Sequence, residues 1–244
     1  YEGPGGPILV VTSAGNPFGT YYAEILRAEG LNAFAVADIS TVDATFLNDY
    51  DVVILGEMAL TAGQATLFTD WVTAGGNLIA MRPDKQLAGL LGLTDAGSIL
   101  SNAYLLVNTA SDPGAGIVDE TIQFHGPADL YTLNGATSLA VLYSDATTST
   151  ANPAVTLVSG GANGGQAAAF TYDLARSVVY TRQGNPAWKD INGDGSAGPV
   201  RADDLFHNST DPDWVNLDKV AIPQADEQQR LLANLIIQTN LDNM

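Results

Sequence analysis

Short, uninterrupted apolar runs in the first third of the chain restrict the folds that it can adopt. The segments 8–12 (ILVVT), 51–56 (DVVILG) and 77–81 (NLIAM) are mainly apolar, with no alternation between apolar and polar positions. Such runs are typical of strands buried on both faces, as in a parallel sheet covered by helices. Because the runs have only the length of a strand, the sequence predicts no transmembrane helix.

Segments with helical periodicity separate these strands. The segment 20–29 places Tyr21, Ile25 and Ala28 on one face, and Gly30 follows as a stop signal. A further strand is expected at 32–37, and helices are expected at 42–47, from Thr61 to Gly75, and at 86–93. This alternation over residues 7–97 predicts an α/β fold with a flavodoxin-like, doubly wound, mostly parallel sheet.

From about residue 98 the pattern becomes richer in strands. Strands are expected at 99–107, 137–143, 153–159, 166–172 and 177–181, with a glycine-rich hairpin connection at 160–165. This second half, 98–183, should add β-hairpin elements to the sheet. An irregular segment, 184–222, precedes a C-terminal helix within 223–241 that turns Leu231, Leu232, Leu235 and Ile236 inward. We expect residues 1–244 to form a single domain.

Oxygen-bearing side chains recur at alternating positions within the irregular segment. They resemble the first half of an EF-hand calcium loop, with Gly195 at its bend. Arg201 stands where that loop has its closing glutamate, so Asp203 or Asp204 would have to close the site. The sequence thus predicts a calcium-loop insertion with a structural Ca²⁺ ion; the alternative is a metal-free acidic turn. The expected ligands are Asp190, Asn192, Asp194, Ser196, Asp203 and Asp204.

The charge balance excludes several classes of partner. The chain carries 27 acidic against 9 basic residues, a net charge of −18. This charge repels phosphate backbones and anionic lipids, so we expect neither a nucleic-acid partner nor a membrane partner. The chain has no cysteine, which excludes disulfides, thiolate zinc sites and a cysteine nucleophile. Together with only three lysines, this composition favours a secreted, extracellular bacterial protein.

Several segments share their order with one known superfamily. They are the strand 8–12 with its loop SAGNP, and the segments YDVVIL (50–55), DWVTAGGNLIA (70–80), DPGAGI (112–117), ADLY (128–131) and SVVYTRQG (177–184). This pattern resembles the class I glutamine-amidotransferase-like superfamily, especially its ThuA-like (trehalose-utilisation-like) branch. The resemblance covers most of residues 7–185 and the last helix, and it implies the fold and a cleft.

The departures from that pattern affect function. The resemblance implies a nucleophilic cysteine at a tight strand-to-helix turn, but the matching turn here is MRPDK (81–85). The family's two histidines correspond to Asp112 and Asn185. Cysteine-dependent glutaminase activity is therefore excluded. The resemblance then implies a degenerate, non-catalytic module of a secreted, carbohydrate-associated bacterial protein.

A ligand cleft is expected where the parallel strands end, because open α/β sheets bind ligands there. Two arginines at this edge could bind an anionic group or could form ion pairs with Glu57 or Asp84. The residues expected to line the cleft are Ser13, Asn16, Glu57, Arg82, Asp84, Arg182 and Asn185.

Three functions remain open from the sequence. The first is a non-catalytic structural or ligand-binding module that is stabilised by calcium and associates with carbohydrate or with other domains of a larger secreted protein. The second is a hydrolase of an ester, amide or glycoside, in which His125 acts as general base with Glu57 or Asp129. The third is a glycan-binding module in which exposed Trp188 and Trp214 stack on sugar rings.

Overall fold

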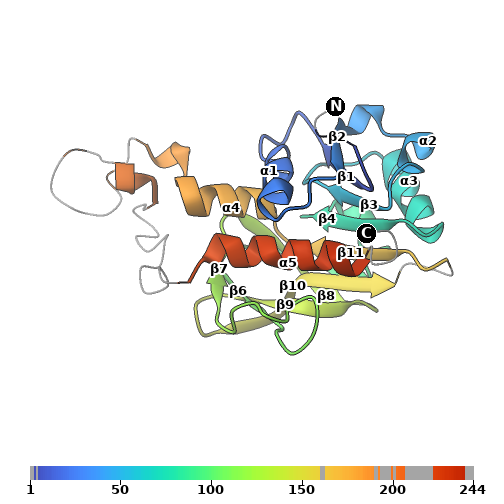
Figure 1. The fold of residues 1–244 in the computed structure, drawn as a ribbon. Coiled ribbons are helices and arrows are strands. Elements are labelled where there is room, and N and C mark those ends of the chain that lie inside the picture. Colours follow the sequence, from blue (N-terminus) through green and yellow to red (C-terminus); the bar gives the residue numbers. More distant parts are fainter. Residues whose placement is uncertain are drawn as a thin grey trace.

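The computed structural model describes residues 3, 5–159, 163–189, 192, 199, 202–206 and 222–239. Within these residues, a nine-stranded sheet forms the centre of the molecule (Figure 1). Its strands, in spatial order, are β2 (Phe34–Asp38), β1 (Ile8–Thr12), β3 (Val52–Leu55), β4 (Asn77–Met81), β11 (Gln166–Phe170), β10 (Ser149–Ser159), β9 (Thr137–Tyr143), β6 (Tyr104–Val107) and β7 (Ile122–Gln123).

The sheet has a parallel half and an antiparallel half. The strands from β2 through β11 pair in parallel, and those from β11 through β7 pair antiparallel. The α/β class and the expected parallel strands of the first hundred residues are confirmed. The pairing of Ser159 with Gln166 also confirms the expected hairpin between β10 and β11.

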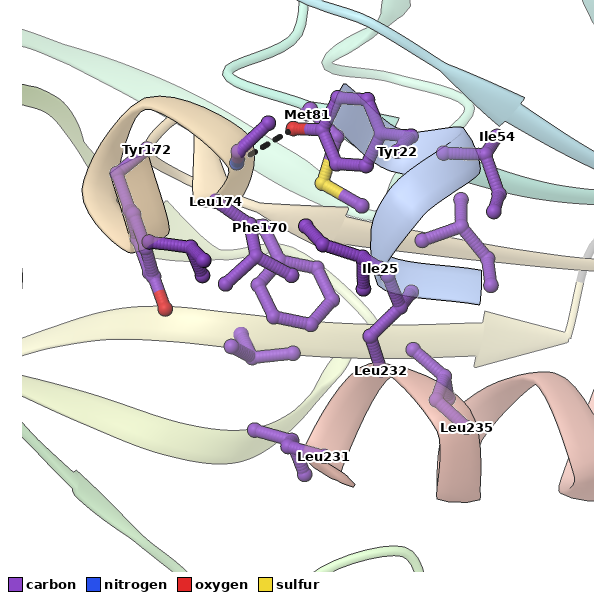
Figure 2. Packing of buried hydrophobic residues seen from close by; sticks show 14 of the residues in the cluster. Tyr22, Ile25, Ile54, Met81, Phe170, Tyr172, Leu174, Leu231, Leu232 and Leu235 are labelled. Carbon is purple, nitrogen blue, oxygen red and sulfur yellow. Dashed lines mark hydrogen bonds between the residues drawn. The ribbon is translucent and has the colours of Figure 1, made fainter. Parts of the chain in front are cut away.

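Both faces of the parallel half are buried, which explains the continuous apolar runs. In β1, Ile8 and Val10 pack into one hydrophobic cluster, while Leu9 and Val11 pack into a second cluster on the other face. Helices α1 (Tyr21–Ala28), α4 (Leu174–Gln183) and α5 (Gln224–Thr239) contribute to the first cluster, and α2 (Ala44–Leu47) and α3 (Ala62–Thr73) to the second. Figure 2 shows α1, α4 and α5 meeting the strands in the first cluster.

A separate two-stranded sheet joins β5 (Leu93–Ser101) to β8 (Pro127–Leu133) in antiparallel pairing. The backbone N–H of Asp129 in β8 donates to the carbonyl of Thr171, just beyond β11 (2.9 Å). This bond fixes β8 beside the carboxyl end of the parallel half. Asp129 therefore lies close to Thr171 and to Arg82, which are distant from it in the sequence.

The expected strand at 177–181 is wrong, because this segment lies within α4. The β-branched residues Val178, Val179 and Thr181 favour a strand, but that preference is weak and depends on context. Two features favour the helix instead. The carboxylate of Asp173 accepts the N–H of Arg176 as an N-cap, and Leu174 and Val178 are buried one helical turn apart.

Other element boundaries also differ from expectation. The expected helix at 86–93 is a single 3₁₀ turn, η2 (Lys85–Leu87), and Leu93 already belongs to β5. The expected strand at 99–107 is divided between β5 and β6, with Asn102 between them at a positive φ of 51°. The shorter elements are η1 (Ile39–Thr41), η3 (Pro186–Trp188) and η4 (Ala202–Phe206).

Helix α5 confirms the expected C-terminal helix, and Leu231, Leu232, Leu235 and Ile236 are all fully buried. Its polar residues also take part in the interior. The side-chain amide of Gln228 donates to the carbonyl of Gln123 (2.7 Å) and accepts from the hydroxyls of Tyr172 (3.0 Å) and Ser177 (3.1 Å). Across the described part of the chain, no helix has the length and apolarity needed to cross a membrane.

Candidate functional site: a charged cleft at the strand ends

A cleft of about 550 Å³ lies at the carboxyl ends of the parallel strands. Its walls come from the loop after β1, the loop after β3 and the turn after β4, together with Asp129 of β8 and Arg176 of α4. This is the edge where open α/β sheets bind ligands. The volume falls within the range of about 300–1,000 Å³ that is usual for small-molecule sites.

Charged side chains of the cleft and its rim form one series of ion pairs with alternating sign. Both Arg176 (2.9 Å) and Arg82 (2.7 Å) pair with the carboxylate of Glu57. Arg82 also pairs with Asp129 (3.2 Å), and Lys85 bridges Asp129 (3.4 Å) and Asp95 (2.8 Å). The series, called here the ion-pair chain, therefore runs through Arg176, Glu57, Arg82, Asp129, Lys85 and Asp95.

Burial and neighbouring charges change the pKa of Glu57 and of Arg82. Burial raises the pKa of Glu57, and the guanidinium groups of Arg176 and Arg82 oppose that rise only in part. For Arg82, burial alone would lower the pKa, but the carboxylates of Asp129 and Glu57 outweigh it and raise the pKa. The arginine therefore stays charged, and it holds two carboxylates in place.

Arg82 occupies a strained backbone position at the start of the turn 82–85. Its φ of 37° lies in the left-handed region, which residues with a side chain adopt at a cost. Three hydrogen bonds support the turn. The N–H of Arg82 donates to the carbonyl of Phe170 (2.8 Å), and the carboxylate of Asp84 accepts the N–H groups of Leu60 and Gln86 (both 2.9 Å).

A buried carboxylate beneath the cleft fixes the surrounding loops. Asp173, 2% exposed, accepts hydrogen bonds from the hydroxyl of Tyr22 (2.6 Å) and the amide of Asn16 (3.0 Å). The same amide of Asn16 donates to the backbone carbonyl of Glu57 (3.2 Å). Burial, reinforced by Asp173, raises the pKa of Tyr22. These contacts join the loop after β1, α1 and α4 directly below Glu57.

The structure brings most of the expected cleft residues together. Ser13, Asn16, Glu57, Arg82 and Asp84 all line the cleft, and so does Asp129. The sequence does not indicate Arg176 as a cleft residue, because the strand expected at 177–181 begins after it, whereas the structure places Arg176 in the capped helix α4. Lys85 was recognised only as part of the turn 81–85.

Two expected cleft residues lie elsewhere because 177–181 is helical. Arg182, in the last turn of α4, forms an ion pair with Asp226 of α5. Asn185 lines a neighbouring hollow on the other side of Arg176. Neither residue is among the described residues that line the cleft.

His125 does not line the cleft and is only 2% exposed. Its backbone N–H donates to the hydroxyl of Ser177 (3.1 Å). Burial lowers the pKa of the imidazole to about 3, so the ring is neutral near pH 7. The expected role as general base therefore finds no support in its position.

Most of the expected calcium ligands lie outside the described residues. These are Asp190, Asp194, Ser196 and the side chain of Asp203; Trp214 also lies outside. Of the described candidates, Asp204 lies in η4 and is 2% exposed. The described part of the chain holds no group of three or more His, Asp or Glu side chains able to bind a metal. Trp188, in η3, is half-buried.

The backbone at Arg82 can be tested with two substitutions that both remove its ion pairs. We expect Arg82→Ala to lower the free energy of unfolding by about 1–3 kcal/mol, because two partly buried carboxylates lose a partner. Arg82→Gly should be roughly 1 kcal/mol more stable than Arg82→Ala, since glycine adopts a positive φ without cost. Urea denaturation measures both values, and a glycine variant less stable than the alanine variant would contradict the left-handed conformation.

The burial of His125 predicts a pH effect on stability. The unfolded chain binds a proton at His125 near pH 6.5, whereas the folded chain does so only near pH 3. Stability should therefore fall as the pH drops through this window, by up to about 1.4 kcal/mol per pH unit. Between pH 6 and 4.5, wild type should lose about 2 kcal/mol more than His125→Asn, as measured by urea denaturation. Equal losses would show that His125 is not buried in its neutral form.

No protein-family profile matches the sequence, and no curated protein matches it. Among solved structures, a β-galactosidase from Bacillus circulans sp. alkalophilus is similar in fold, with a TM-score of 0.55 and 14% identity over 71% of this chain and 30% of that chain. The α-L-fucosidase isoenzyme 2 from Paenibacillus thiaminolyticus gives a TM-score of 0.54 and 15% identity over 70% of this chain and 29% of that chain. The mmIFT52 N-terminal domain gives a TM-score of 0.50 and 12% identity over 69% of this chain and 87% of that chain.

These identities show a shared fold alone. The chain spans about a third of the length of the two glycoside hydrolases, whereas the matched region makes up most of the mmIFT52 domain. The fold of this chain is therefore one that occurs both within large glycoside hydrolases and as most of a smaller domain.

Proposed function

We propose that this chain is a non-catalytic α/β module of a larger secreted, carbohydrate-associated bacterial protein, and that its cleft binds a small polar ligand. The observation that carries this proposal is the position of Arg82 and the pairing of its guanidinium with two carboxylates. Arg82 stands at the turn where the class I glutamine-amidotransferase-like superfamily, which the sequence resembles, has its nucleophilic cysteine. Both of its terminal nitrogens are engaged with carboxylates, Nη1 with Glu57 and Nη2 with Asp129.

The chemistry of the cleft favours binding over catalysis. A general base needs a carboxylate oxygen that can take up a proton. In Glu57, Oε1 pairs with Arg82 and Oε2 pairs with Arg176, so protonation of either oxygen would break an ion pair. The carboxylate of Asp129 is likewise held between Arg82 and Lys85. The two catalytic candidates that line the cleft therefore act as structural anions.

The ligand proposed for the cleft is rich in hydroxyl groups. Carboxylate, guanidinium, ammonium, amide and hydroxyl groups all line the cleft, so it offers both donors and acceptors. Such mixed polar groups match the alternating donors and acceptors of a sugar. The glycoside hydrolases that share the fold are in keeping with a carbohydrate ligand.

A hydrolase is the second candidate function, and the raised pKa of Glu57 favours it. Burial raises the pKa of Glu57, and a raised pKa is common among carboxyl groups that act as catalytic acids or bases. The reaction would be the hydrolysis of an ester, amide or glycoside, with Glu57 in place of His125 as the central group.

One pair of measurements separates the two functions. We expect no turnover of p-nitrophenyl esters or p-nitrophenyl glycosides, and we expect calorimetric binding of galactose or mannose that is weakened at least fivefold in Glu57→Gln. The matched control, Glu24→Gln, changes an exposed residue of α1 and should bind as wild type does. Turnover that is abolished by Glu57→Gln but retained in Glu24→Gln would establish the hydrolase and overturn the non-catalytic module.

We also propose that a calcium ion stabilises the segment 190–204, on the strength of its alternating oxygen side chains. Ca²⁺ at 100 times its dissociation constant would add about 2.7 kcal/mol to the free energy of unfolding. For a chain of this size, the melting temperature should rise by roughly 5–10 °C. Calorimetry in the presence of CaCl₂, MgCl₂ or EGTA measures the shift in melting temperature. A double variant that carries both Asp190→Asn and Asp194→Asn should not show this shift. Equal melting temperatures with calcium and with EGTA would contradict the site.

A further inference from the structure

A second hollow of about 360 Å³ adjoins the cleft. Arg176 lines both spaces, so they meet at this side chain. On the far side from the cleft, the walls of the hollow include Phe18, Asn102, Tyr180 and Asn185. These residues come from the loop after β1, the junction of β5 and β6, helix α4 and the segment that follows it.

Two asparagines that line this hollow have oriented side-chain amides. The Oδ1 atom of Asn102 accepts the N–H of Gly126 (2.8 Å), and the Oδ1 atom of Asn185 accepts the N–H of Ala187 (3.0 Å). Each bond fixes the plane of its carboxamide. Each Nδ2 group carries two N–H donors, and within the described part of the chain neither group donates to another residue. The hollow therefore suits a ligand rich in acceptor oxygens.

An aromatic pair supplies the apolar part of the wall. Phe18 and Tyr180 pack edge to face, with ring centroids 5.2 Å apart and planes at 85°. Both residues are half-buried and line the hollow. Apolar ring surface beside amide donors matches a sugar, which has apolar C–H patches and hydroxyl oxygens on one small ring.

The position of Arg176 at the junction is itself constrained. Its guanidinium carbon lies 5.2 Å from the centre of the Phe18 ring, and its Nη2 atom pairs with Glu57. Gly126 lies against the same side chain. A Cβ atom at Gly126 would come within 2.7 Å of the Cδ atom of Arg176, so only glycine leaves room for it there. Arg176 is thus held between the two spaces, with contacts to both.

We propose that the cleft and the second hollow form one groove for an oligosaccharide, with Arg176 between two sugar positions. This inference rests on the proposed ligand-binding function of the cleft and adds a second sugar position, so that the ligand is a chain of linked sugars. The cleft holds one sugar among charged groups, and the hollow holds the next sugar between the aromatic pair and the two asparagine amides. Affinity should therefore depend on the number of linked sugars.

The test uses β-1,4-linked mannose and galactose oligomers of one to four units, titrated calorimetrically into the whole chain. We expect affinity to rise at least tenfold from one unit to three. Asn102→Asp and Asn185→Asp keep the Oδ1 acceptor and the shape but replace the two donors with an acceptor. Each should weaken binding of the trimer five- to tenfold and leave binding of the monomer unchanged.

The matched control is Asn108→Asp, which makes the same change of charge. Asn108 also accepts a backbone N–H through Oδ1, from Ala110 (3.2 Å), but it lines neither the cleft nor the second hollow. Melting temperatures of the three variants check that each remains folded. This control should bind all oligomers as wild type does.

The outcomes separate this inference from the function on which it rests. Equal affinity for one and three units, with no effect of either groove variant, would overturn the groove and leave the single cleft intact. Loss of trimer binding in the control as well would assign the effect to charge and overturn the groove. Binding of no mannose or galactose unit, single or linked, would overturn both the groove and the sugar-binding cleft.

Discussion

Burial of the parallel strands on both faces determines where the polar and charged groups of the chain can lie. Because β1, β3, β4 and β11 are covered by helices on both sides, the segments that leave them emerge at one edge of the sheet. Glu57, Arg82 and Asp173 lie just beyond the ends of three of these strands. The apolar interior thus determines where the charged groups meet.

Once gathered at this edge, the charged groups stabilise one another. Arg82, Lys85 and Arg176 are three of only nine basic residues in a chain with a net charge of −18, yet all three line one cleft. Each compensates a carboxylate that would be costly to leave partly buried and unpaired. The left-handed backbone of Arg82 is then supported by two ion pairs and by a hydrogen bond to Phe170. The cleft is therefore organised before any ligand binds.

The sequence predicted the features that depend on local pattern and on sheet geometry. Apolar runs indicated the parallel strands, and the rule for strand ends placed Ser13, Asn16, Glu57, Arg82 and Asp84 together. Contacts between distant segments were not predictable. Val178 and Val179 suggested a strand, whereas packing against the core and the cap from Asp173 produce a helix, which moves Arg182 away and brings Arg176 in. The burial of His125 likewise depends on long-range packing, which its neighbours in the sequence do not indicate.

A double-mutant cycle measures whether Glu57 and Arg82 act as a structural ion pair. Glu57→Gln, Arg82→Met and the double variant would be compared with wild type by urea denaturation at two salt concentrations. For a partly buried pair, we expect a favourable coupling energy of about 1–3 kcal/mol that salt reduces only slightly. A coupling energy near zero, or one that disappears at high salt, would contradict a structural ion pair.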